Sequence, residues 1–409
     1  MTHESLTLTA GIKQATEGLN TYGPQKPVWQ IAFSGGKDST ALVLLMVHLV
    51  KSGKVKPPEK VFVTIVDTMQ ELPPLIDNAR NVAAICEEIG WTVVWITPPL
   101  ESRFHYQLLG RGLHTPGMNG RNRWCTRHLK SQPLHDKKGW TAHHDIDPDD
   151  VLLLYGSRVD ESNSRAVSMA NSCTLAGSEC GTGLYMQDKA EGSRYSPITN
   201  WRNCSVWDWL AMAKRKVGYD PAMLLNLYGK AEHFVTKDIG DMTPEQVLDA
   251  IDATTRTGCI GCPVVGHDYA LDRVCEWPEW SHLEPFKGLR TLYVELREHR
   301  NRLRQPAGER YKSGKLCKNQ NRVGPICISA RIRGLKGILA MQEESHAIAD
   351  EHGRDRYWLI DEELQAAIEE AIEAKTYPRG WTGDEPLATD PGCPAADYVG
   401  PDTLQPYLF

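Results

Sequence analysis

The sequence has no apolar run of the ~18–20 residues that a membrane-spanning helix needs. The longest candidate, residues 41–50, ends at Lys51 and is more typical of a helix in a protein core. Residues 1–20 show no cationic start followed by an apolar segment, so no secretory signal is expected. These two absences favour a cytoplasmic location and no membrane partner.

The chain also has no excess of positive charge. Its 409 residues include 46 Lys and Arg against 52 Asp and Glu, a formal net charge of −6. The molecule as a whole is therefore not a basic nucleic-acid binder, and any such contact must come from local basic segments. The length suits about two domains. The apolar fraction of 41% and the charged fraction of 24% are typical of a globular protein.

Cysteine, by contrast, is abundant, with 11 residues. A reducing compartment does not favour a disulfide framework, so some of these thiols are predicted to be metal or cluster ligands. Cys259 and Cys262 form a C-x-x-C pair flanked by Gly258 and Gly261, which let backbone amides turn toward bound sulfur. Zinc and iron–sulfur clusters both use such pairs. A redox dithiol and buried structural cysteines are the alternatives.

The first half of the chain alternates between strand and helix patterns. Strand-like apolar runs occupy residues 28–33, 61–66, 91–96 and 151–155, and helical patterns occupy residues 40–50 and 75–89. Continuous apolar strands separated by helices predict an α/β fold, with a parallel sheet and helices on both faces.

The first strand leads into the sequence SGGKDS, which consists of Ser34, Gly35, Gly36, Lys37, Asp38 and Ser39. Glycines allow the backbone to approach a phosphate, and the start of the following helix favours negative charge. The two serines add hydroxyl donors, and the lysine adds a cation. The spacing differs from the GxxxxGK[ST] loop. An ordinary glycine turn is the alternative reading.

Two further strand ends carry candidate ligand-binding residues. Asp67 follows the second strand, and Gly156 follows the fourth. Since ligands bind beyond the carboxyl ends of parallel strands, we expect both residues to share one cleft with the SGGKDS loop. Asp67 and Glu71 suit ribose hydroxyls or Mg²⁺, or a plain helix cap. Arg158 and Arg165 suit polyphosphate, because guanidinium groups make bidentate contacts.

Basic residues gather in three other places. Cys125 lies between Arg123 and Arg127, where cations favour thiolate or hold phosphates. A solvated basic loop is the alternative. Two other clusters could contact a nucleic-acid backbone or form solvated helix faces: Arg297, Arg300, Arg302 and Arg304, and Arg331, Arg333 and Lys336.

Several segments resemble known families. SGGKDS resembles the SGGxDS PP-loop of ATP pyrophosphatases, which cleave ATP between the α- and β-phosphates. Trp124-Cys125 with Pro133-Leu134 resembles the phosphoadenosine-phosphosulfate reductases of the same superfamily, although those carry a cysteine pair here. A closer resemblance is to the DndC-like (or SspD-like) ATP pyrophosphatases of bacterial DNA phosphorothioation. The matching segments lie at residues 66–73, 123–130, 156–165, 197–207, 258–262 and 324–342.

The resemblance implies a 4Fe–4S cluster on four cysteines. Cys125, Cys259 and Cys262 correspond to three of them, and Cys275 is expected as the fourth, with Cys204 as a second choice. It also implies that ATP and Mg²⁺ bind and that the catalytic residues are Lys37, Asp38, Arg158 and Arg165. Residues expected to hold the nucleotide are Ser34, Gly35, Gly36, Lys37, Asp38, Ser39, Asp67, Gly156 and Arg158.

The implied reaction adenylates a DNA backbone phosphate, after which sulfur from a cysteine desulfurase displaces AMP. DNA, the desulfurase and other phosphorothioation subunits are the implied partners, in a system linked to restriction and phage defence. Three alternatives remain open: a sulfonucleotide reductase, a tRNA-thiolating enzyme, and a non-catalytic iron–sulfur DNA-binding subunit.

The sequence suggests four regions. Residues 1–27 are expected to be an N-terminal extension, and residues 28–215 the PP-loop domain. Residues 216–345 are expected to be a helical region with the cysteine cluster and basic helices, and residues 346–409 a helix with an extended tail. Helical patterns in the second half of the chain occupy residues 201–213, 244–254, 289–304, 331–344 and 361–375.

Overall fold

The structure is a computed structural model that describes residues 7–117, 123–135, 139–161, 178–179, 183–188, 192–229, 258–305, 315 and 322–389. The chain forms two compact units. Unit 1 comprises Met1–Asp67, Glu71–Thr97 and Ser131–Thr257, and unit 2 comprises Thr68–Gln70, Pro98–Lys130 and Gly258–Phe409. The division is not the linear one expected at residue 216, because residues 98–130 belong to unit 2.

Unit 1 is built on a seven-stranded sheet in the order β3-β2-β1-β4-β7-β6-β5. The strands are β1 (Val28–Phe33), β2 (Lys60–Val66), β3 (Thr92–Ile96), β4 (Val151–Leu154), β5 (Ser178–Glu179), β6 (Leu184–Asp188) and β7 (Gly192–Ser196). From β3 to β7 all neighbours are parallel, whereas β6 and β5 are antiparallel. The predicted α/β fold is therefore confirmed.

The strand order places the SGGKDS loop at a reversal point. The chain proceeds from β1 outward to β2 and β3, and then returns to place β4 on the other side of β1. In open parallel sheets, ligands bind where the strand order reverses, beyond the carboxyl ends of the strands. The loop after β1 occupies this position.

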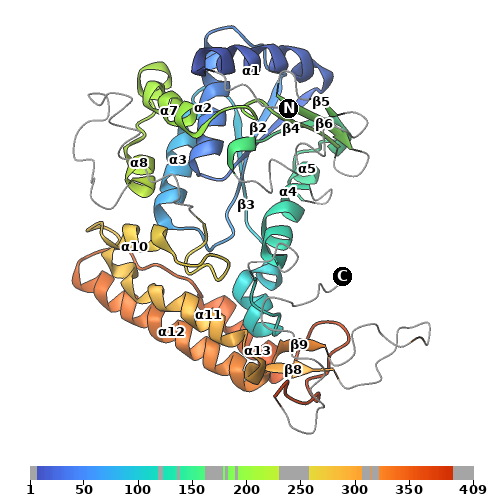
Figure 1. Ribbon diagram of the computed structural model, residues 1–409, viewed down its shortest axis with the longest axis vertical. Coiled ribbons are helices and arrows are strands. Elements are labelled where there is room, and N and C mark those ends of the chain that lie inside the picture. Colours follow the sequence, from blue (N-terminus) through green and yellow to red (C-terminus); the bar gives the residue numbers. More distant parts are fainter. Residues whose placement is uncertain are drawn as a thin grey trace. The chain divides into compact units, whose positions relative to one another are not determined.

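Helices cover both faces of this sheet (Figure 1). The helices of unit 1 are α1 (Leu8–Tyr22), α2 (Lys37–Lys51), α3 (Pro73–Glu87), α4 (Gln132–His135), α5 (Trp140–His143), α7 (Asn203–Val217) and α8 (Ala222–Tyr228). On α2, every residue from Thr40 to Val47 is buried. A helix that is apolar all round has to be enclosed, and α7 packs on its outer side. The indole nitrogen of Trp209 on α7 donates to the Ala41 carbonyl of α2 at 3.0 Å.

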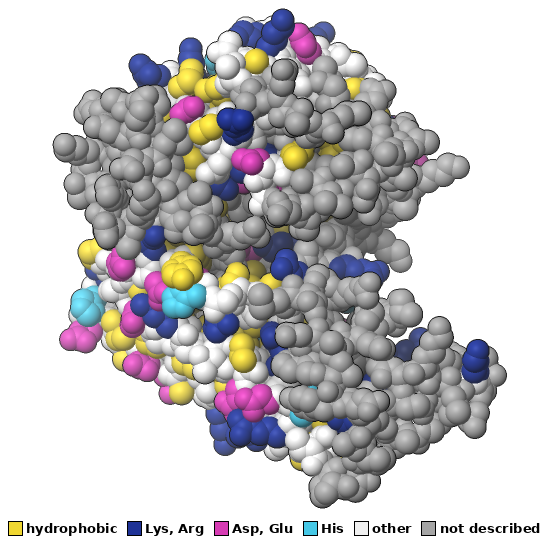
Figure 2. Space-filling view, viewed as in Figure 1, with side chains coloured by type: hydrophobic (Ala, Val, Ile, Leu, Met, Phe, Trp, Pro, Cys, Tyr) yellow, Lys and Arg dark blue, Asp and Glu magenta, His cyan; other side chains and the backbone are white. Residues whose placement is uncertain are grey.

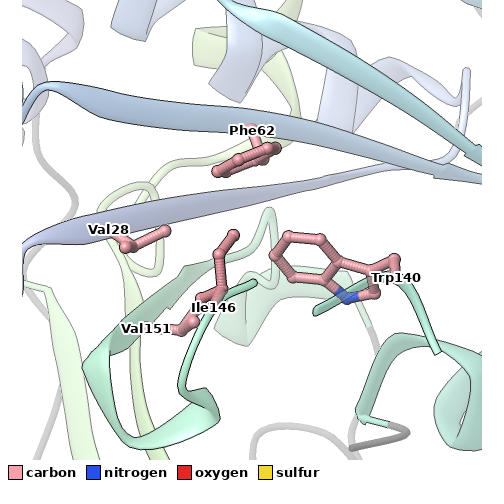
Figure 3. Packing of buried hydrophobic residues seen from close by; sticks show 5 residues of the cluster. All are labelled: Val28, Phe62, Trp140, Ile146 and Val151. Atoms are coloured by element: carbon pink, nitrogen blue, oxygen red, sulfur yellow. The ribbon is translucent and has the colours of Figure 1, made fainter. Parts of the chain in front are cut away.

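A cluster of buried side chains lies on the sheet face that α5 covers. It consists of Val28, Phe62, Trp140, Ile146 and Val151, which point toward one another in Figure 3. The rings of Phe62 and Trp140 have centroids 5.3 Å apart and are tilted by 53°. Such tilted pairs stabilise beyond their buried area.

Unit 2 is mainly helical in its described part. Its elements are α10 (Tyr269–Cys275), α11 (Leu289–Leu296), α12 (Ile328–Glu351), α13 (Glu362–Glu373) and a hairpin of β8 (Arg302–Arg304) and β9 (Val323–Ile326). α11 packs along α12 (Figure 1). The helical C-terminal region is confirmed, while the helix predicted at residues 244–254 lies outside the described residues.

The helix predicted over residues 289–304 is wrong beyond residue 296. α11 ends at Leu296, and residues 302–304 form β8 instead. Arg302 is 1% exposed, and its Nε donates to the Gly324 carbonyl of β9. Arg302 thus stabilises the hairpin from inside, and it takes neither of the two roles considered for this cluster, a nucleic-acid contact or a solvated helix face.

Arg331 in the third basic cluster is also structural. Its side chain is fully buried, and its guanidinium donates to the carbonyls of Leu109, Gly110 and Thr376. Its charged group also lies 5.1 Å from the ring centroid of Tyr377. Arg331 is therefore not available to a nucleic-acid backbone.

None of the helices in the described ranges is long and apolar enough to cross a membrane.

The sheet cluster should contribute strongly to the stability of unit 1. Trp140→Ala is expected to lower the free energy of unfolding by about 3–5 kcal/mol, because it opens a cavity in a closed core. Trp95→Ala on β3 is the control, since that indole is 40% exposed and should cost clearly less. Urea unfolding followed by circular dichroism compares the two variants. Equal losses would contradict the assignment of this cluster as a core.

Candidate nucleotide-binding site and cysteine site

The loop after β1 depends on a left-handed glycine. Gly35 has φ +74°, and a Cβ atom at this position would lie 2.4 Å from the Leu75 carbonyl oxygen of α3. No other residue fits both the dihedral angle and the contact. Gly36 then caps α2 with extended backbone, φ −77° and ψ 161°. The chain thereby turns from strand to helix within three residues.

Two serine hydroxyls close this loop. The Oγ atoms of Ser34 and Ser39 lie 3.0 Å apart, and the Ser34 amide donates to Ser39 Oγ at 3.2 Å. Ser39 Oγ also donates to the Gly36 carbonyl at 3.0 Å. The amides of Asp38 and Ser39 belong to the first turn of α2, where a helix offers no carbonyl partner. Hydroxyls, amides and the helix dipole together form an arrangement suited to an anion.

Asp38 is held between two cations. Lys37 Nζ lies 2.9 Å from Asp38 Oδ2, and Arg158 Nε lies 2.7 Å from Asp38 Oδ1. Arg158 is 2% exposed and also donates to the Trp201 carbonyl at 3.2 Å. The buried guanidinium thus positions the loop through Asp38. The predicted role of Arg158 in contacting phosphate stays a prediction.

The end of the fourth strand reaches the loop as expected. A Cβ atom on Gly156 would lie 2.9 Å from the Asp38 carbonyl oxygen, so this glycine allows the close approach. Asp67 lies at the end of β2, where its amide donates to the Ile96 carbonyl at 3.0 Å. Glu71 is 7% exposed. Arg165 lies outside the described residues.

Three residues near the loop were not predicted from the sequence. Asn78 on α3 donates to the Gly35 carbonyl at 2.7 Å, and Tyr219 donates to Asn78 at 2.7 Å. The Tyr228 ring of α8 lies 5.2 Å from Lys37 Nζ. These three residues belong to no sequence motif, so only their burial in the folded structure shows that they contribute to the site.

The cysteine site lies in unit 2. Beyond the effect of burial, Cys262 is close enough to Cys125 to raise the pKa of its thiol. Burial, and to a smaller extent Cys259 and Cys262, raise the pKa of Tyr293. Burial raises the pKa of the Cys125 and Cys262 thiols. The amides of Val264 and Val265, which donate to the Cys262 sulfur, lower the pKa of Cys262 by a smaller amount. The expected role of Gly258 and Gly261 in turning amides toward bound sulfur stays a prediction.

The expected fourth ligand has different neighbours. Cys275 lies on α10 beside Lys287, Glu284 and Asp272, and burial raises the pKa of its thiol to about 12. Cys204 lies on α7 in unit 1. Within the described ranges, no three or more His, Cys, Asp or Glu side chains form a group that could hold a metal ion. The described residues therefore do not present the complete four-cysteine set that a 4Fe–4S cluster requires.

The contact between Asp38 and Arg158 should stabilise unit 1. Arg158→Met is expected to lower the free energy of unfolding by about 3 kcal/mol, because it leaves a largely buried carboxylate with one cation. Arg80→Met removes a comparable pair with Asp77, whose side chains are 67% and 32% exposed, and should cost less than about 1 kcal/mol. Urea unfolding measures both. A small effect of Arg158→Met would show that the pair does not hold the loop.

This chain is similar to a number of solved structures, including the following three. The phosphoadenylyl-sulfate reductase from Candida auris, a phosphate complex, shows 14% identity over 56% of this chain and 95% of that chain, with a TM-score of 0.33. The NAD+ synthetase from Burkholderia pseudomallei shows 11% identity over 62% and 87%, with a TM-score of 0.32. The U34-tRNA thiolase NcsA from Methanococcus maripaludis, solved with its 4Fe–4S cluster, shows 12% identity over 71% and 80%, with a TM-score of 0.33.

No curated protein matches the sequence. A family model does match, over residues 29–263, which is more than half of the 409 residues. It covers β1, the SGGKDS loop, the sheet of unit 1 and the C-x-x-C pair. The chain belongs to the family of the phosphoadenosine phosphosulfate reductase domain.

Proposed function

We propose that this protein is an ATP pyrophosphatase, which cleaves ATP to AMP and pyrophosphate. The observation that carries the proposal is the loop between β1 and α2. There, a left-handed glycine, two hydroxyls and the first turn of α2 surround one point at the end of the sheet. Backbone amides at the start of a helix point at bound phosphate groups and donate hydrogen bonds to them.

The chain's own residues would divide the work. The loop amides and the hydroxyls of Ser34 and Ser39 would hold the leaving pyrophosphate. Lys37 would move from Asp38 to a phosphate oxygen and stabilise the charge that develops there. Asp38 and Arg158 would keep the loop in place. Mg²⁺, when bound, would bridge phosphate oxygens and neutralise part of their charge.

We propose a DNA backbone phosphate as the acceptor. A non-bridging oxygen of that phosphate would attack the α-phosphorus of ATP, and pyrophosphate would leave. A persulfide sulfur from a cysteine desulfurase would then displace AMP from the adenylated DNA phosphate, and a second thiol would cleave the remaining S–S bond, forming a disulfide with the donor cysteine and leaving sulfur on the DNA. The ordered matches to DndC-like proteins between residues 66 and 342 support this acceptor, and no step is assigned to an iron–sulfur cluster.

DNA contact would need local basic residues or partner subunits. Arg302 and Arg331 are buried within unit 2 and contact carbonyls. On the face shown in Figure 2, the described surface carries acidic as well as basic side chains, in line with the net charge of −6. The exposed Arg123, beside Cys125, remains a candidate contact.

Reduction of a sulfonucleotide is the second candidate, because the family is named for it. Such a reductase needs a reactive thiolate, and burial raises the pKa of the Cys125 thiol. Cys393, the cysteine nearest the C-terminus, lies outside the described residues. The raised pKa of Cys125 counts against a reactive thiolate at that position, whereas Cys393 bears on neither candidate.

The test uses anaerobically purified full-length protein with α-labelled ATP and Mg²⁺, with and without duplex DNA. We expect AMP or DNA-linked AMP together with pyrophosphate. ADP as the sole product would refute the proposal. Turnover of adenylyl sulfate with thioredoxin, without ATP cleavage, would favour the reductase instead.

The lysine of the loop gives a matched pair of variants. Lys37→Met is expected to lower kcat about 100-fold or more, because a charge that stabilises the transition state is lost. Lys51→Met removes an exposed lysine at the other end of the same helix and should leave kcat unchanged. Pyrophosphate release measures both rates. If the two variants matched wild type, Lys37 would have no part in the chemistry.

A further inference from the structure

A chain of buried hydrogen bonds leads to the loop from behind. The Tyr219 hydroxyl donates to Asn78 Oδ1 at 2.7 Å, and Asn78 Nδ2 donates to the Gly35 carbonyl at 2.7 Å and to Thr40 Oγ1 at 3.0 Å. The side chains of Tyr219, Asn78 and Thr40 are 3%, 1% and 0% exposed. Bonds in this setting are shielded from competing water and are costly to leave unmade.

The direction of each bond is fixed by chemistry. A carbonyl oxygen only accepts, so the amide nitrogen of Asn78 must face Gly35 and its oxygen must face Tyr219. Burial raises the pKa of Tyr219 well above its ordinary value, which keeps the hydroxyl protonated as a donor. The hydrogen bonds from Tyr219 through Asn78 to Gly35 therefore have only one possible direction, and the Gly35 carbonyl is the final acceptor.

That carbonyl determines where an amide points. The Gly35 carbonyl and the Gly36 amide belong to one planar, trans peptide group, in which C=O and N–H point in opposite directions. Because Asn78 holds the carbonyl toward the interior, the Gly36 N–H points away from it. Ser34, at the start of the loop, is exposed, whereas Gly35 is buried. The amide is thus directed toward the open side of the loop.

We propose that Asn78 and Tyr219 are positioning residues that orient the Gly35–Gly36 peptide, so that the Gly36 amide binds a phosphate of the nucleotide. This inference rests on the proposed function for the identity of the ligand. Without these hydrogen bonds, the Gly35–Gly36 peptide could rotate, since glycine tolerates both signs of φ.

α7 makes this arrangement rigid. The indole nitrogen of Trp209 on α7 donates to the Ala41 carbonyl of α2. α7 ends at Val217, and the capping residue Gly218, with φ +80°, turns the backbone just before Tyr219. One helix therefore braces α2 and also supplies the hydroxyl that reaches the loop through Asn78. A positioning role needs such a rigid support.

The first experiment measures the loop without any ligand. Hydrogen exchange, resolved at single amides of residues 34–40 by fragmentation, is compared for Tyr219→Phe and Tyr185→Phe. Tyr185 also loses one hydroxyl bond, to Gln25 at 3.0 Å, but lies on β6 away from the loop. We expect at least about fivefold faster exchange in this segment for Tyr219→Phe only, the equivalent of one neutral hydrogen bond. Unchanged exchange in Tyr219→Phe would overturn the inference.

The second experiment measures binding of ATP with Mg²⁺ by calorimetry in the same variants. Tyr219→Phe should weaken ATP binding about five- to tenfold, while Tyr185→Phe should bind as wild type does. Asn78→Asp, which cannot donate to the Gly35 carbonyl, should weaken it further. The two Tyr→Phe variants should melt within a few degrees of each other, so a merely structural role would affect both alike.

The two experiments separate the two ideas. If wild type binds no ATP, the proposed function and the phosphate role of the Gly36 amide both fail, while hydrogen exchange still decides whether the chain holds the loop. If wild type binds ATP and Tyr219→Phe binds it equally well, the positioning role fails and the proposed function stands.

Discussion

The structure of the candidate site depends on the contact of Gly35 with the Leu75 carbonyl. A loop that turns from strand to helix within three residues can be this tight only if its left-handed residue lacks a side chain. The close approach also brings Asn78, one turn further along α3, within hydrogen-bonding distance of the Gly35 carbonyl. Gly156 has a similar role after β4, because the lack of a Cβ atom lets the backbone there approach Asp38.

Much of unit 1 could be predicted from the sequence because its signals are local. The strand patterns at residues 28–33, 61–66, 91–96 and 151–155 lie within a residue or two of β1 to β4. Continuous apolar strands leave few alternatives to a parallel sheet. The SGGKDS loop is equally local, since its glycines, hydroxyls and helix start are consecutive. Burial of α2 follows from its apolar surface on all sides.

The rest depends on long-range contacts that sequence order does not contain. Residues 98–130 belong to unit 2, although the strands of unit 1 lie before and after them. Arg331 looks like a surface cation in the sequence, yet its partners are the carbonyls of Leu109 and Gly110, more than 200 residues away. The charged residues around Arg302 suggest a helix, but in the structure Arg302 lies in β8 and pairs with β9. A basic cluster therefore does not by itself indicate a nucleic-acid surface.

Arg158 shows the same limit at the site itself. An arginine after a parallel strand suggests a phosphate ligand, and that role stays a prediction, but the sequence does not reveal that its guanidinium also holds Asp38. That carboxylate presents an electrostatic problem, because it lies in a loop suited to anions. The helix dipole stabilises Asp38 at the start of α2, yet its charge would repel a phosphate. Lys37 and Arg158 both contact Asp38, and Arg158 also lies 3.9 Å from the exposed Asp160, so the two cations are matched by two carboxylates. Because Arg158 is buried while Lys37 is only partly so, Lys37 is the cation able to turn toward an incoming phosphate, and the carboxylate it leaves stays neutralised by Arg158.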